Sequence, residues 1–187
     1  MKFKLSPFLQ SANGSLGELV YYELDGQLVG RRKAKPKDKL TAARSAHRQR
    51  VKLAAAWSRK TMTDPKQKAE YRTACRGHQT PYNIGFRDYL IAPVVEAIDL
   101  TGYTGKAGQS LWIKATDDFE VKQVEVMIWD AAGNLIEEGL AERGSNLTDW
   151  KYLTRTETIA GQSVRVQVTA VDRPGNRTVA ERWQFLG

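Results

Sequence analysis

The hydrophobic period of the chain changes near Pro93, and this change limits its possible folds more than any other feature. After this position every second residue is apolar in the segments 111–115, 124–128 and 164–168. A period of two is typical of a strand with one buried face. Short turn-forming segments separate these runs, so about seven strands are expected in residues 93–187. The pattern predicts an antiparallel sandwich of two sheets.

Before Pro93 the sequence predicts one β-hairpin followed by helices. Residues 18–24 and 27–32 flank Asp25-Gly26, a dipeptide that suits the positive φ angles of a type I′ turn. A hairpin alone is marginally stable, so other elements must cover one of its faces. This half is therefore predicted to be a hairpin combined with a small helical bundle.

Three helices are expected in that bundle. An alanine-rich segment from residue 40 to about residue 60 has helical periodicity. Asp64-Pro65 is a typical N-cap and first helical position, which predicts a helix over residues 65–76. The aromatic spacing of residues 82–90 predicts the third helix, and Trp57 and Tyr71 are expected to join those aromatics in a small core.

Charge is distributed very unevenly between the two halves. The chain carries 29 Lys+Arg and 21 Asp+Glu, a net charge of +8. Residues 1–92 contain 19 basic and 7 acidic residues (+12), whereas residues 93–187 contain 10 and 14 (−4). Such asymmetry indicates two modules with different partners. We therefore predict an α+β protein with a basic module at 1–92 and a sandwich at 93–187.

The basic charge is densest in residues 31–60, where 12 basic residues meet one acidic residue, a net charge of +11. A segment of this kind is suited to neutralising phosphates. The predicted polyanion-binding residues are Arg31, Arg32, Lys33, Lys35, Lys37, Arg44, Arg48 and Lys52. The alternatives are a solvated helix face or a surface that docks on an acidic protein. No complete signature of sequence-specific DNA or RNA reading is present.

Two tryptophans are candidates for contact with a partner. Trp112 and Trp129 fall on the outward phase of their predicted strands. A shift of the phase by one residue would place both in the core instead. In the outward phase they predict an aromatic surface on the sandwich that faces either a protein partner or a sugar.

Other reactive side chains have structural interpretations that fit better. Cys75, the single cysteine, lies three positions before His78, but Gly77 between them indicates the end of a helix. Four carboxylates at predicted strand ends suit ordinary turns and lack the spacing of a calcium loop: Asp117, Asp118, Asp130 and Asp172. Glycine-rich phosphate-binding loops are also missing from the sequence. We therefore expect no catalytic residues, no metal site and no cofactor.

Two family resemblances bear on the architecture. The stretches 117–139 and 161–176 resemble bacterial immunoglobulin-like domains, which occur on adhesins, enzymes and phage structural proteins, although the cysteine pair of antibody domains is missing. This resemblance implies an immunoglobulin-like sandwich. The first half is similar to uncharacterised small proteins of bacteria and their phages through Thr41, Ala43, Arg48, Ala55, Ala56, Trp57, Tyr71, Tyr82, Asn83 and Phe86. That similarity implies a setting in mobile elements or virion-like assemblies.

The sequence thus predicts a non-enzymatic structural or interaction protein, either of a phage-like or of another repeating assembly. The basic module would anchor to a polyanion or an acidic partner, and the immunoglobulin-like module would contact proteins, including further copies of the chain. The alternative is an architectural nucleic-acid-binding protein with an accessory sandwich. Since residues 1–10 lack the apolar stretch of a secretory signal, we expect synthesis in the cytoplasm, with or without assembly into a particle there, and no membrane partner.

Overall fold

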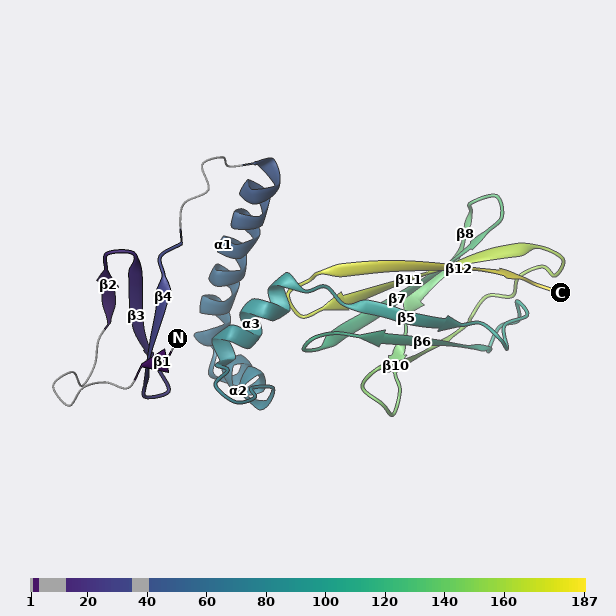
Figure 1. Ribbon diagram of the computed structural model, residues 1–187. Helices are drawn as coiled ribbons and strands as arrows, with labels where there is room; N and C mark the ends of the chain where they lie inside the picture. The colour runs from purple at the N-terminus through teal and green to yellow at the C-terminus, as the bar shows by residue number, and fades with distance from the viewer. Residues whose placement is uncertain (1, 4–12, 35–40) are drawn as a thin grey trace. The chain divides into compact units, whose positions relative to one another are not determined.

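A computed structural model describes residues 2–3, 13–34 and 41–187 of the chain (Figure 1). The chain forms two compact units, Met1–Ser45 and Ala46–Gly187. The division falls inside the first helix, α1 (Ala42–Met62), and does not coincide with the expected boundary at 92/93. Helices that were expected to belong to a basic module therefore lie in the same unit as the sandwich.

The first unit contains a four-stranded antiparallel sheet. Its strands are β1 (Lys2–Phe3), β2 (Gly14–Leu16), β3 (Leu19–Leu24) and β4 (Gln27–Arg32), in the order β1-β4-β3-β2. Strands β3 and β4 form the predicted hairpin, with Leu24 opposite Gln27. Asp25 and Gly26 have φ angles of 54° and 70°, the left-handed pair that a type I′ turn requires.

Two of the helices begin after side-chain caps, and the first of these, Asp64, is the cap that the sequence predicted. Helix α2 (Pro65–Thr73) starts after Asp64, whose Oδ1 accepts hydrogen bonds from the backbone N–H groups of Lys66 (2.8 Å) and Gln67 (3.4 Å). Helix α3 (Pro81–Leu90) starts after Thr80, whose Oγ1 accepts one from Asn83 (3.2 Å). These side chains satisfy backbone donors that have no partner within the helix. Helix α2 ends three residues before the predicted position.

The rest of the second unit consists of two antiparallel four-stranded sheets. The first has the order β5-β6-β10-β9, with β5 (Val94–Asp99), β6 (Ser110–Thr116), β10 (Asp149–Leu153) and β9 (Glu142–Arg143). The second has the order β12-β11-β7-β8, with β12 (Arg177–Phe185), β11 (Ser163–Asp172), β7 (Val121–Asp130) and β8 (Leu135–Leu140). The prediction of an α+β chain with antiparallel sheets is confirmed.

One apolar core joins these two sheets. The alternating residues Leu111, Ile113, Val124, Val126, Ile128, Val164, Val166 and Val168 are all buried in it, in the predicted phase. Their neighbours along each strand point outward and are half-buried or exposed, except Thr169, which is buried. Each sheet therefore has a separate outer face that is available for contacts.

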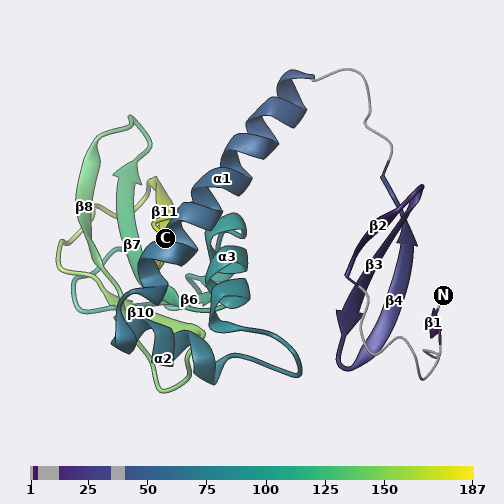
Figure 2. The ribbon, with the colours of Figure 1, turned by 90° about the vertical axis from the view of Figure 1, so that its left-hand side faces the viewer.

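The helices lie at the end of the sandwich opposite the C-terminus (Figure 1), so they stand in front of its strands in the view of Figure 2. The Asn176 side chain, in the turn between β11 and β12, donates from Nδ2 to the carbonyl oxygens of Tyr89 (3.2 Å) and Asp88 (3.3 Å) at the end of α3. The ring of Tyr71 in α2 packs on Phe119, with 4.4 Å between ring centroids. Within the described residues, no helix is both long and apolar enough to span a bilayer.

Candidate functional site

The part of α1 that belongs to the second unit carries a basic face. Arg48, Lys52 and Arg59 lie within about 40° of helical rotation of one another, given about 100° per residue, and all three are exposed. The buried residues Ala54, Ser58 and Thr61 lie on another side of the helix. None of the three basic side chains forms an ion pair with another residue in the described ranges. We call these three residues the basic face of α1.

Arg59 was not among the predicted polyanion-binding residues, although helical periodicity places it beside Arg48. It lies eleven residues, about three helical turns, after Arg48 and so returns to the same face. Arg50, by contrast, has a structural contact: its Nη2 donates to the carbonyl oxygen of Leu90 at the end of α3 (3.0 Å). Arg50 thus links α1 to α3, whereas Arg48, Lys52 and Arg59 face solvent.

The remaining predicted basic residues belong to the first unit or lie outside the described residues. Arg31 and Arg32 end strand β4, Lys33 follows it, and all three are exposed. Arg44 is exposed at the start of α1, with its N–H donating to Thr41 Oγ1 (3.3 Å). Lys35 and Lys37 fall outside the described residues. The predicted set is therefore divided between the two units.

Trp112 is exposed on the outer face of the first sheet. It projects from β6 with 47% of its surface accessible, and the Lys151 ammonium lies 5.6 Å from its ring centroid. Asp99 and Lys151 are its cross-strand neighbours. The outward phase predicted for Trp112 is confirmed, and charged residues flank this single aromatic side chain.

Trp129 also has the predicted outward phase, but it is half-buried. The Arg165 guanidinium on β11 lies 5.4 Å from its ring centroid, a cation–π contact. The expectation that Trp129 itself forms an open aromatic surface is corrected by this contact, because side chains of neighbouring strands pack around it. Strand alternation indicates which face a residue points to, whereas cross-strand neighbours decide how much of it they cover.

The exposed aromatics on that sheet are Trp183 and Phe185, which the sequence analysis missed. They project from β12 with 58% and 62% of their surfaces accessible. Trp183 lies opposite Arg165, which in turn lies opposite Trp129. The alternation of Val179, Glu181, Trp183 and Phe185 in β12 was the signal that could have identified them. We call the outer side of this sheet the Trp183 face.

A buried polar cluster lies where α2 and α3 meet the sandwich. Asp88 in α3 is fully buried, and its Oδ2 accepts a hydrogen bond from the Tyr71 hydroxyl (2.5 Å). Burial raises the pKa of Asp88 to about 7, because desolvation penalises the charged carboxylate. The nearby carboxylates of Asp117 and Asp172 raise that pKa further, whereas the Tyr71 hydrogen bond opposes the shift.

Arg173 is the cation of this cluster. It forms ion pairs with Glu70 of α2 (2.7 Å) and Glu120 of the sandwich (3.2 Å). Its guanidinium also lies over the rings of Tyr71 and Phe119, at 5.4 and 5.1 Å from their centroids. Residues from α2 therefore converge here with residues of the β6–β7 and β11–β12 connections, an arrangement suited to holding the helices in place.

The other reactive residues make local contacts. The Cys75 thiol is half-buried and donates to the carbonyl oxygen of Tyr71 (3.4 Å). Asp117 and Asp130 accept backbone N–H hydrogen bonds from Phe119 (2.8 Å) and Asn134 (2.8 Å) in their turns. Asp172 does the same for Gly175 (2.8 Å), and Asp118 forms an ion pair with Arg87. Across the described ranges, no three His, Cys, Asp or Glu side chains are grouped so that they could hold a metal ion.

Comparisons with known proteins identify no family for this chain. No protein-family model matches, and no curated protein matches. Among solved structures, CopC from Methylosinus trichosporium OB3b is similar with a TM-score of 0.37 and 13% sequence identity, over 49% of this chain and 89% of that chain.

Proposed function

We propose that this chain is a non-enzymatic interaction protein that anchors to a polyanion through its basic residues and presents an immunoglobulin-like sandwich to partners. The observation that carries the proposal is the basic face of α1, where three exposed cations share one side of the helix. Cations placed in this way neutralise phosphates and release condensed counterions on binding. Arg31, Arg32 and Lys33 of the first unit would add to the same attraction.

The geometry of the basic face suits contact with the phosphate backbone of a nucleic acid rather than recognition of its bases. Arg48 and Arg59 are separated by about 16 Å along the helix axis, at 1.5 Å per residue, so the face follows a line of charge. Phosphate contacts of this type position a protein without selecting a sequence. The second candidate, an architectural nucleic-acid-binding protein, rests on the same face with duplex DNA as the polyanion.

The sandwich would supply the contacts with proteins. An immunoglobulin-like arrangement is supported by the eight antiparallel strands of β5–β12, which enclose one core. Trp112, an exposed aromatic anchor beside Asp99 and Lys151, has the character of an interface hot spot. Because residues 93–187 carry −4 and residues 1–92 carry +12, the sandwich of one copy would also attract the basic residues of another in a repeating assembly made in the cytoplasm.

Binding to a short duplex DNA across a salt series tests the anchoring proposal. We expect the triple variant Arg48→Gln, Lys52→Gln and Arg59→Gln to bind at least about tenfold more weakly at moderate salt. Its slope of log K against log salt should be less steep by about 2.7, at about 0.9 for each lost phosphate contact. Fluorescence anisotropy on nuclease-treated protein measures both quantities.

The matched control removes the same charge elsewhere. Lys68, Lys106 and Lys122 are exposed lysines away from the basic face, and their replacement by Gln should weaken binding by less than about threefold. Equal losses in both triple variants would show that net charge alone is responsible and would contradict a defined face. If the wild type binds neither DNA nor heparin, the polyanion proposal is wrong. Light scattering at low salt then shows whether copies associate with one another instead.

A further inference from the structure

The Trp183 face differs from the basic face of α1 in both shape and charge. Leu135, Trp129, Arg165 and Trp183 form one row across the four strands, as their cross-strand pairing shows. The next row consists of Glu138, Met127, Gln167 and Glu181. Phe185 lies two residues beyond Trp183 on the same strand. Aromatic surface and hydrogen-bonding groups are therefore interleaved on one open sheet.

The charges of this face are largely compensated within it. Arg165 pairs with Glu181 at 3.3 Å, and Arg177 pairs with Glu125 at 3.1 Å. Glu138 adds a further exposed carboxylate. A polyanion would meet these carboxylates and be repelled, so the face favours an uncharged partner.

A dry protein interface fits these residues poorly. Charged residues are depleted from the centres of protein interfaces, and burying an ion pair costs desolvation free energy. Here the pair Arg165–Glu181 lies directly beside the most exposed tryptophan. A hydrated ligand that offers hydroxyl groups would leave these groups hydrogen-bonded, either directly or through water.

We propose that the Trp183 face binds a neutral glycan chain. Trp183 and Phe185 would stack against the apolar C–H faces of the sugar rings, while Arg165, Gln167 and Glu181 would hydrogen-bond the hydroxyl groups. Aromatic rings provide this contact because their negative faces attract polarised hydrogens. This site is independent of the polyanion anchor.

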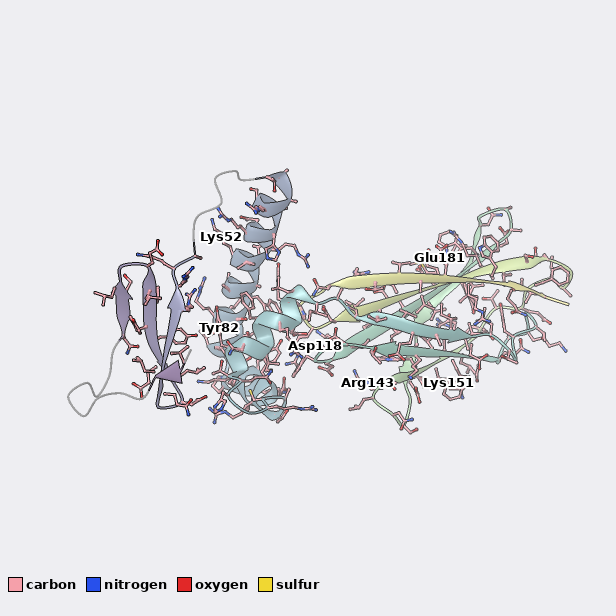
Figure 3. All side chains as sticks on the ribbon, in the orientation of Figure 1. Lys52, Tyr82, Asp118, Arg143, Lys151 and Glu181 are labelled. Atoms are coloured by element: carbon pink, nitrogen blue, oxygen red, sulfur yellow. The ribbon has the colours of Figure 1, made fainter. Side chains whose placement is uncertain are left out.

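Glu181 and Lys151 lie on opposite outer faces of the sandwich (Figure 3). A tryptophan on the face of Lys151 can therefore serve as a control for Trp183. Trp183→Ala alters the proposed glycan face. Trp112→Ala removes a tryptophan of similar exposure (47% against 58%) from the opposite face, beside Lys151. Because both side chains project outward, both variants should retain the thermal midpoint of the wild type, which a melting curve verifies.

The experiment titrates the full chain with hexasaccharides of β-linked glucose, mannose, xylose and N-acetylglucosamine and of α-linked glucose. Intrinsic tryptophan fluorescence and the indole N–H signals in NMR spectra report binding. We expect saturable binding of at least one of these neutral glycans, with at least a tenfold loss of affinity in Trp183→Ala and less than a twofold change in Trp112→Ala.

Three outcomes overturn the proposal. The first is the absence of binding to every glycan in the set. The second is equal loss of affinity in the two variants. The third is a concentration-dependent dimer of the wild type that Trp183→Ala abolishes, which would assign the face to a second copy of the chain. None of these outcomes depends on DNA binding, so failure here is distinguishable from failure of the polyanion anchor.

Discussion

Replacing Asp88 by Asn should make the protein more stable at pH 8 than the wild type and should remove much of the pH dependence of its stability. The carboxyl of Asp88 is fully buried at the junction of α3 and the sandwich. Its Oδ1 has no hydrogen-bond partner among the described residues. A carboxylate in that position loses its hydration, and the nearby Arg173, which pairs with Glu70 and Glu120, offsets only part of that loss, so ionisation is disfavoured.

The sign of the effect follows from the two pKa values. The pKa of Asp88 is 3.8 without its folded surroundings and about 7 in the folded protein. Between these values the folded state retains a proton that the unfolded state has released, so the free energy of unfolding falls as the pH rises. The two pKa values differ by about three, and each pKa unit corresponds to about 1.4 kcal/mol. The loss in the free energy of unfolding therefore has an upper limit of about 4 kcal/mol, reached above pH 7. Asp172, whose pKa is also raised by burial, adds a loss in the same direction.

The amide introduced by Asp88→Asn would keep an oxygen for the Tyr71 hydroxyl and would never ionise. Denaturant unfolding at pH 5 and pH 8 is the measurement. We expect the advantage of Asp88→Asn over the wild type to grow by a few kcal/mol between the two pH values. A variant that is less stable than the wild type at pH 8, or an advantage that does not change with pH, would show that the carboxyl does not carry this penalty.

Asp118→Asn is the matched control for this prediction. Asp118 also lies near the junction, but it forms its ion pair with Arg87 at the surface, where 48% of the arginine side chain is accessible. Loss of a surface ion pair changes stability by less than about 1 kcal/mol. The control should therefore show no comparable advantage at pH 8.

Replacing Tyr71 by Ala should loosen the helices from the sandwich at a cost of about 4 kcal/mol in the free energy of unfolding. The Tyr71 ring is fully buried, packs on Phe119 and lies beneath the Arg173 guanidinium. Its hydroxyl donates to Asp88. The variant would remove all of these contacts at once and leave a cavity at the junction.

The sandwich itself should survive this substitution. Its core cluster consists of residues between Ile98 and Leu186 and does not include Tyr71. Far-UV circular dichroism follows the helices, while the indole N–H signal of the buried Trp150 in NMR spectra follows the sandwich. We expect the helical signal to be lost at lower denaturant concentration than the Trp150 signal.

Tyr71→Phe separates packing from hydrogen bonding. This variant keeps the ring against Phe119 and Arg173 and removes only the hydroxyl, so its cost should be about 1 to 2 kcal/mol. A Tyr71→Ala variant no less stable than Tyr71→Phe would contradict the role of the ring at the junction.

The sequence alone was sufficient for features that depend on near neighbours along the chain. The Asp25-Gly26 turn, the cap at Asp64, and the inward phase of Val124 or Val166 are all as predicted. Turn conformation, capping and strand alternation are decided within a few residues, because backbone geometry repeats over that distance.

Only the tertiary structure decided which distant residues meet. Asp88 and Asn176 are 88 positions apart, and their contact depends on where the β11–β12 turn falls against the end of α3. Likewise, Trp129 is covered by Arg165 and Trp183 is left open because of strand order and register. Sheet order and register are set by packing over the whole core, so a residue's period in the sequence gives its face but not its lateral neighbours.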